Sequence, residues 1–192
     1  MDRIRLRDGV PLAQHIAATA AVLFYQRGIA VVGVDLIAAR AGVSKRTVYR
    51  HFPTKDELVA AALLHGPFVV FPKDGAPHQR LLGAFDALVA FVEDPAYRGC
   101  PYINAAVELT NPRHPARAIV QQQADRRRRW FKRRLDEMAH PQAELIAEEL
   151  DILFDGALAN STKRQSSTPA HAARAAAERV IELRPLAQAV PA

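Results

Sequence analysis

Side chains that carry positive charge or donate hydrogen bonds are concentrated in the stretch SKRTVYRHFPTK, residues 44–55. Guanidinium, ammonium, phenol and hydroxyl groups at this density suit contacts to phosphate oxygens and to the edges of bases. The predicted DNA-contact residues are Ser44, Lys45, Arg46, Thr47, Tyr49, Arg50, His51 and Lys55. Within this set, we assign base reading to Lys45 and Arg46, and phosphate contacts to Tyr49, His51 and Lys55.

Two short helices are expected to position these side chains. Val34, Ile37, Ala38 and Ala41 follow one another at the i, i+3, i+4 and i+7 spacing of a single apolar helix face. Gly42 then allows the left-handed conformation of a tight turn, and the hydroxyl of Ser44 can cap the next helix.

In the second helix, Val48 and Phe52 stand four residues apart and are expected to face inward. Lys45, Arg46, Tyr49 and Arg50 then project outward from this helix. A short helix, a glycine turn and a second helix with a basic outer face are typical of a helix-turn-helix, whose second helix fits the major groove of DNA.

The stretch VDLIAARAGVSKRTVYRHFPTKDEL, with FYQRG before it, resembles the tetracycline-repressor (TetR) family of bacterial transcriptional regulators. Gly33 departs from the family pattern, which usually has a Thr or Ser at this helix cap. The resemblance implies three N-terminal DNA-binding helices, followed by a helical body that dimerises through its last two helices and holds a ligand pocket between its middle helices. We accordingly predict a DNA-binding domain over residues 1–53 and a regulatory and dimerisation domain over residues 54–192.

Composition favours a globular chain with a polyanionic partner. The 192 residues are 49% hydrophobic and carry a formal net charge of +6. The single cysteine, Cys100, excludes an internal disulfide framework, and no signal peptide or long apolar run is present, so we expect a cytoplasmic protein without a membrane partner. Arg3, Arg5 and Arg7 form a basic arm that either contacts DNA or is simply solvated.

Helical periodicity continues through the rest of the chain, and no long alternating strand pattern is present, so the predicted fold is all-α. Besides the two motif helices, helices are expected over about 11–28, 54–64, 81–93, 101–110, 115–139, 142–161 and 170–186. For residues 67–77 the pattern does not decide between helix and loop.

The last two predicted helices carry apolar stripes that one thin helical body cannot cover. These stripes are Leu145, Ile146, Leu150, Leu153 and Ala157 on one helix, and Ala173, Ala177, Val180 and Ile181 on the other. Pairing them across a two-fold axis predicts a homodimer with a four-helix interface, and therefore an operator that is an inverted repeat.

The middle helices offer a candidate site for a small-molecule effector of unknown identity. The predicted ligand-binding residues are Phe85, Leu88, Ile103, Asn104, Val107, Glu108, Gln123, Arg127, Trp130 and Phe131. A mostly apolar surface with a few polar groups is how small-molecule sites are built. The alternative is a filled core in which Glu108 and Arg127 pair, because neither charge is expected to be buried alone.

The sequence has few features that indicate an enzyme or a metal-binding protein. The seven histidines are scattered without metal-ligand spacing, and there is neither a glycine-rich phosphate loop nor a Gly-x-Ser-x-Gly elbow, so no catalytic residue, metal or cofactor is predicted. The alternative to a ligand-released repressor is a helical small-molecule-binding or interaction module without specific DNA recognition. The donors retained between residues 44 and 55 argue against this alternative.

Overall fold

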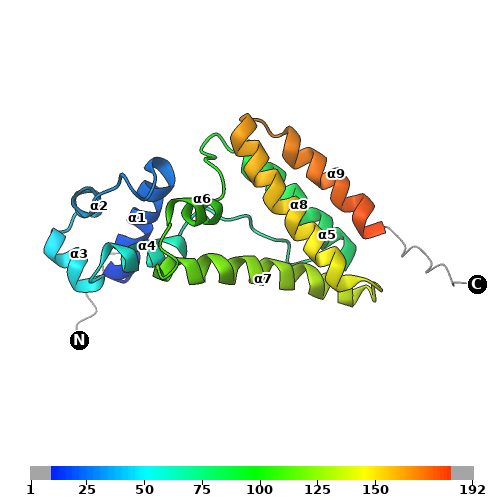
Figure 1. Cartoon of the computed structure of the whole chain (residues 1–192), viewed down its shortest axis with the longest axis horizontal. Helices are drawn as coiled ribbons and strands as arrows, with labels where there is room; N and C mark the ends of the chain where they lie inside the picture. Colours follow the sequence, from blue (N-terminus) through cyan, green and yellow to red (C-terminus); the bar gives the residue numbers. More distant parts are fainter. Residues whose placement is uncertain (1–9, 183–192) are drawn as a thin grey trace, which may run out of the picture. The chain divides into compact units, whose positions relative to one another are not determined.

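The structure is a computed structural model that describes residues 10–182. Its regular elements are all α-helices, which confirms the predicted all-α fold. They are α1 (Leu12–Arg27), α2 (Val34–Ala41), α3 (Lys45–His51), α4 (Lys55–Leu63), α5 (Pro77–Glu93), α6 (Pro101–Glu108), α7 (Pro115–Glu137), α8 (Ala143–Arg164) and α9 (Thr168–Glu182) (Figure 1). The basic arm at Arg3 to Arg7 and the predicted end of the last helix lie outside the described residues.

The chain forms two compact units, each of which includes residues from two separate parts of the sequence. Unit 1 comprises residues 1–67 and 100–122, and unit 2 comprises residues 68–99 and 123–192. The predicted boundary after residue 53 falls inside unit 1 because α4 packs against α1. The chain thus leaves unit 1 before α5, returns with α6, and leaves it again within α7.

The core of unit 1 forms around α1. The stripe predicted for this helix is buried, with Ile16 and Ala20 fully covered, and Leu58 of α4 and Ile37 of α2 join it. Neither α2 nor α3 is long enough to be stable alone in water, so burial against α1 supplies most of their stability.

In unit 2, α5, α8 and α9 pack together (Figure 1). Five aromatic rings fill the space between α5, α7 and α8: Phe71, Phe85, Trp130, Phe131 and Phe154. Phe71 belongs to the segment left undecided by the sequence, which is not helical before α5 begins at Pro77. Its ring centre lies 4.6 Å from that of Trp130. This loop is therefore anchored by an aromatic side chain.

The stripes predicted to pair across a dimer pack mainly within the chain. Ile146, Leu150 and Ala157 of α8 are buried, as are Ala173 and Ala177 of α9 and its Ile181, because α8 contacts both α5 and α9. The apolar side chains that α8 leaves exposed are Leu145 and Ile152. Of the predicted α8 set, only Leu145 therefore lies on an exposed face.

Arg127 pairs with acidic residues of α8 and not with Glu108, which lies in unit 1. Its Nε donates a hydrogen bond to Asp151, and its Nη2 lies 2.9 Å from Asp155 Oδ2 as an ion pair. Burial lowers the pKa of Arg127, but the hydrogen bonds and charges of Asp151 and Asp155 outweigh burial and raise the pKa above its ordinary value. The guanidinium therefore stays charged beside the Phe154 ring, 5.0 Å from its centre.

No helix within residues 10–182 combines the length and apolar character needed to cross a lipid bilayer.

Replacing Arg127 should destabilise the protein because two carboxylates would lose their common partner. We expect Arg127→Met to lower the free energy of unfolding by about 3 kcal/mol, the lower end for buried pairs, since Asp155 is partly solvated. Urea denaturation followed by circular dichroism measures this change. Arg129→Met, an exposed position on the same helix, should stay within about 0.5 kcal/mol of the parent; equal losses in the two variants would contradict the pairing.

Candidate nucleic-acid interface

The turn between α2 and α3 has the geometry expected from its residues. Gly42 lies in the left-handed region at φ 68°, and the N–H of Val43 donates to Ala38 O at 3.0 Å. Ser44 then caps α3, since its Oγ accepts a hydrogen bond from the N–H of Thr47 at 3.1 Å. Both predicted devices, the glycine turn and the serine cap, are therefore present.

The outer face of α3 presents basic and aromatic side chains to solvent. Val48 faces inward and is 1% exposed, and Phe52 packs against the same core. On the opposite side Lys45, Arg46 and Arg50 are exposed, and Tyr49 is 41% exposed. Because the buried valine holds the inner face of α3 in place, the exposed side chains point in a fixed direction. Recognition of base edges in a groove requires such a fixed direction.

Arg46 and Arg50 have no ion-pair or hydrogen-bond partner within residues 10–182, whereas Lys45 has one. Lys45 Nζ donates to Asp35 Oδ2 of α2 at 2.9 Å. This hydrogen bond, and then the charge of Asp35, raise the pKa of Lys45 above its ordinary value. The two guanidinium groups are thus the cations most available to DNA, while Lys45 shares its ammonium group with Asp35 and can reach DNA through its other N–H groups.

The remaining predicted contact residues are less accessible. Ser44 is exposed and its hydroxyl is engaged with Thr47, which is half-buried. His51 is half-buried, and its Nε2 is buried without a partner among the described residues. Lys55 Nζ donates to Ile29 O at 2.7 Å, so it reaches a phosphate only through its other N–H groups.

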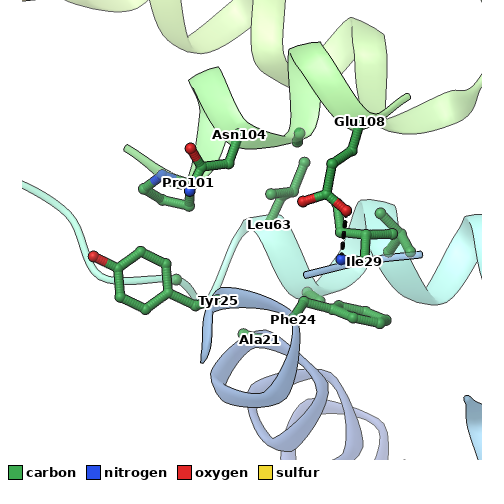
Figure 2. A pocket seen from close by; sticks show the side chains of 12 residues that line it. Ala21, Phe24, Tyr25, Ile29, Leu63, Pro101, Asn104 and Glu108 are labelled. Carbon is green, nitrogen blue, oxygen red and sulfur yellow. Dashed lines mark hydrogen bonds between the residues drawn. The ribbon is translucent and has the colours of Figure 1, made fainter. Parts of the chain in front are cut away.

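The loop between α1 and α2 is held on both sides of one peptide unit, which sequence reasoning did not identify. Besides Lys55 on Ile29 O, the Glu108 carboxylate of α6 accepts hydrogen bonds from the N–H groups of Ile29 at 2.7 Å and Ala30 at 3.2 Å (Figure 2). Gly28 lies at φ 90°, a backbone conformation that residues with a side chain rarely adopt, whereas a Cβ there would only make ordinary contact, 3.4 Å from Glu108 Oε2. The backbone conformation, and not a lack of space, therefore favours glycine at this position.

A small cavity of about 30 Å³ lies beside this clamp (Figure 2). Its lining includes Phe24, Tyr25, Leu63, Asn104 and Glu108. This volume is close to the share of one water molecule in the liquid, so the cavity has no room for an organic ligand as it stands.

The predicted ligand-binding residues are divided between the two units. Unit 1 holds Ile103, Asn104, Val107 and Glu108, and unit 2 holds Phe85, Leu88, Gln123, Arg127, Trp130 and Phe131. Val107 is 76% exposed, so the prediction that its side chain faces inward is wrong. Helix α6 is short, and only its residues Pro101 and Ala105 are buried. In unit 2, Phe85, Leu88 and Phe131 are fully buried in the aromatic core.

Two family models match the chain. The first, described as bacterial regulatory proteins of the tetR family, matches residues 16–62, which contain α2, α3 and most of α1 and α4. The second, described as a tetracyclin repressor-like C-terminal domain, matches residues 77–177, more than half of the chain.

Relatives and solved structures agree with these models. HTH-type transcriptional regulator YjdC of Escherichia coli is 20% identical over 176 residues, covering 88% of this chain and 92% of the relative. HTH-type transcriptional repressor Rv3405c of Mycobacterium tuberculosis is 46% identical over 65 residues, 33% of this chain and 35% of the relative. The crystal structure of SCO4454, a TetR-family transcriptional regulator from Streptomyces coelicolor, superposes with a TM-score of 0.77 at 26% identity, covering 88% of this chain and 94% of that chain.

Arg46→Ala tests the base-reading assignment. Loss of the guanidinium should cost about 1 to 3 kcal/mol on the preferred DNA site and relax the preference at one or two base pairs. Selection from a random duplex library, run in parallel on parent and variant, measures both effects. Arg126→Ala, which removes an exposed arginine of α7 instead, should keep the parent's preference; an unchanged preference in Arg46→Ala would refute the assignment.

The clamp on the α1–α2 loop can be tested by amide hydrogen exchange. Glu108→Ala removes a charged acceptor from two N–H groups, so exchange of the Ile29 amide should become about tenfold faster or more. NMR exchange rates of Ile29 and Ala30 measure this directly. Val107→Ala, one residue earlier on the exposed side of α6, should leave these rates unchanged. Equal rates in Glu108→Ala and the parent would rule out the clamp.

Proposed function

The chain belongs to the tetR family of bacterial regulatory proteins and is a DNA-binding transcriptional regulator, and we propose that it acts as a cytoplasmic homodimeric repressor that a small molecule releases from an inverted-repeat operator. The observation that carries the proposal is the outer face of α3, where Arg46 and Arg50 are exposed and unpaired among the described residues. A regulator of this kind acts by binding, so the proposal includes no catalytic step.

Relatives of this chain carry both roles in their names. Rv3405c, 46% identical over 65 residues, is named a repressor, and FasR of Mycolicibacterium smegmatis, 37% identical over 81 residues, is named an activator. The proposal takes the role of the relative with the higher identity, which is repression. Two of the eight predicted contact residues change their roles in the proposal. Lys55 and His51 contribute mainly to the fold of unit 1, and Arg46, Tyr49 and Arg50 supply most of the contacts to DNA.

The proposed dimer interface lies on the outer face of α8, which differs from the stripe expected from the sequence. Leu145 and Ile152 are 54% and 63% exposed, and Ala159 continues their line at a spacing of seven residues. The outer face of α9 carries Ala172 and Ala175. Exposed apolar side chains beside small residues suit close packing of helices in a four-helix interface.

Gly156 supports this choice of face. It stands inside α8, where glycine costs roughly 0.5 to 1 kcal/mol relative to alanine. A Cβ at this position would meet nothing within 4 Å in the chain, so no contact within the protomer requires a glycine. A glycine at this position would allow the backbone of a partner helix to approach α8 closely beside Ile152 and Ala159.

Release by an effector requires a ligand that prefers one arrangement of the protein. A coupling of about 1 to 3 kcal/mol would weaken DNA binding roughly 5- to 150-fold. Glu108 is a natural element of such coupling because α6 grips the loop that leads into α2 through this side chain. The aromatic core residues of unit 2 would have to move before a ligand could enter among them.

A dimer interface on α8 predicts that two substitutions separate the protomers without unfolding them. Ile152→Glu puts a charge on the exposed face, and Gly156→Leu adds a side chain that has room in the protomer but none between close-packed helices. Both variants should sediment as monomers at micromolar concentration with the helical content of the parent. In a gel shift on an inverted repeat, each should bind at least about tenfold more weakly than the parent.

Ala118→Glu, on the exposed side of α7 in unit 1, is the matched control and should remain dimeric. A parent protein that sediments as a monomer, or one that prefers a single half-site to the inverted repeat, would overturn the homodimer proposal.

A further inference from the structure

A second cavity, half open to solvent, lies in unit 2, and none of the residues that line it belongs to the predicted ligand-binding set. It measures about 540 Å³, within the range of roughly 300 to 1,000 Å³ typical of small-molecule sites. It is formed where α5 ends and where α8 turns into α9 (Figure 1). The lining residues are Val92, Glu93, Asp94, Tyr97, Arg98, Gly99, Ser161, Thr162, Gln165, Ser166 and Ser167.

The lining differs in chemistry from the aromatic core of unit 2. Four of its side chains are aliphatic hydroxyls, and Gln165 adds an amide. Tyr97 closes one side, where its hydroxyl donates to Leu158 O at 2.8 Å and lies 2.9 Å from Thr162 Oγ1. The hydroxyls of Thr162, Ser166 and Ser167 already have partners in the protein. A hydroxyl both donates and accepts hydrogen bonds, so their remaining capacity suits a ligand with several hydroxyl groups.

Ser161 indicates that the cavity is built for a polar partner. This residue is 1% exposed and lines the cavity, yet its Oγ has no hydrogen-bond partner within residues 10–182. An unsatisfied buried hydroxyl costs about 1 to 3 kcal/mol, and alanine would remove that cost inside a helix. A ligand group that forms a hydrogen bond with this hydroxyl would supply the missing partner and remove that cost.

The charge of the cavity selects for a cation. Glu93 and Asp94 stand at the C-terminal end of α5, and the C-terminal end of α8 adds a second set of helix carbonyls. Hydrogen bonds from His171 and then Ser167 lower the pKa of Glu93, so this carboxylate is ionised at neutral pH. The lining residues include these two carboxylates and one cation, Arg98. Glu93 already lies 3.0 Å from Nε2 of His171, and Lys163 and Arg164 stand in the last turn of α8, so Asp94 is the carboxylate that the proposal assigns to a cationic ligand.

We propose that this cavity binds a small hydroxylated molecule that carries an ammonium group, of which an amino sugar is the simplest example. The ammonium group faces the carboxylate of Asp94 at the end of α5, and the hydroxyls face Ser161, Thr162 and the serines of the α8–α9 turn. The inference rests on the proposed function only in identifying this ligand with the effector. Binding itself requires neither DNA nor a dimer.

Three sugars of similar size separate charge from hydroxyl content: glucosamine is a cation, glucose is neutral and gluconate is an anion. Isothermal titration calorimetry of the full chain with each sugar, up to tens of millimolar, measures the binding. We expect saturable binding of glucosamine, with glucose at least about tenfold weaker and gluconate weaker still, because a hydrogen bond to a charged group is worth more than one between neutral groups.

Two variants and a control locate the site. Asp94→Asn should reduce the preference for glucosamine over glucose at least about fivefold, whereas Asp74→Asn removes the same charge from an exposed loop residue outside the cavity and should leave the preference unchanged. Ser161→Ala should weaken glucosamine several-fold while the free protein melts at the same temperature or higher, since an unsatisfied hydroxyl is removed.

Three results would each overturn the proposal: no saturable binding of glucosamine, equal binding of the three sugars, or unchanged binding in both Asp94→Asn and Ser161→Ala. The proposed function fails by a different measurement, namely loss of inverted-repeat binding in a gel shift without sugar. Added glucosamine that binds the protein and leaves that gel shift unchanged would overturn the identification of the ligand with the effector.

Discussion

Burial of Val48 is the constraint on which the DNA-binding surface depends. Helix α3 has seven residues, fewer than an isolated helix needs to be stable in water. Its position is fixed by one fully buried side chain on the inner face, by the serine cap at its start and by the glycine turn before it. Because the inner face is held in this way, every outward side chain of α3 has a defined direction, which recognition of base edges requires.

The loop before α2 is likewise held in place by a small number of contacts. The backbone N–H of Ile29 donates to a glutamate and its C=O accepts from a lysine, so three separate elements of unit 1 meet at a single residue. Buried or half-buried backbone groups need such partners, and charged ones are the strongest available. His114 adds a contact between two side chains: its Nε2 lies 3.3 Å from a carboxylate oxygen of Asp56 in the first turn of α4. Residues after position 100 thereby support the helices that read DNA.

Unit 2 holds charged and polar groups both beside its aromatic core and at the ends of its helices. The guanidinium of Arg127 remains beside the rings because two aspartates of α8 compensate for its lost hydration. Hydroxyls and carboxylates gather instead at the ends of α5 and α8, where helix termini leave carbonyl groups to be satisfied. The hydroxyl of Ser161 at this point has no hydrogen-bond partner within residues 10–182.

The sequence by itself determined the features that depend on neighbours within a few residues. Apolar spacing, Gly42 and Ser44 define the helix-turn-helix and the direction of its basic face, because caps, turns and helix faces are local. Only the tertiary structure decided which charges pair, since Arg127 and Asp151 are 24 residues apart and Lys55 and Ile29 are 26 apart. It also decided which side of α8 faces its own chain: Ile146 and Leu150 form one apolar face and Leu145 and Ile152 form another, and periodicity cannot rank two such faces. The contacts of α8 with α5 and α9 determine which face is buried. In the same way, contacts with the aromatic rings of α7 and α8 anchor the loop at Phe71.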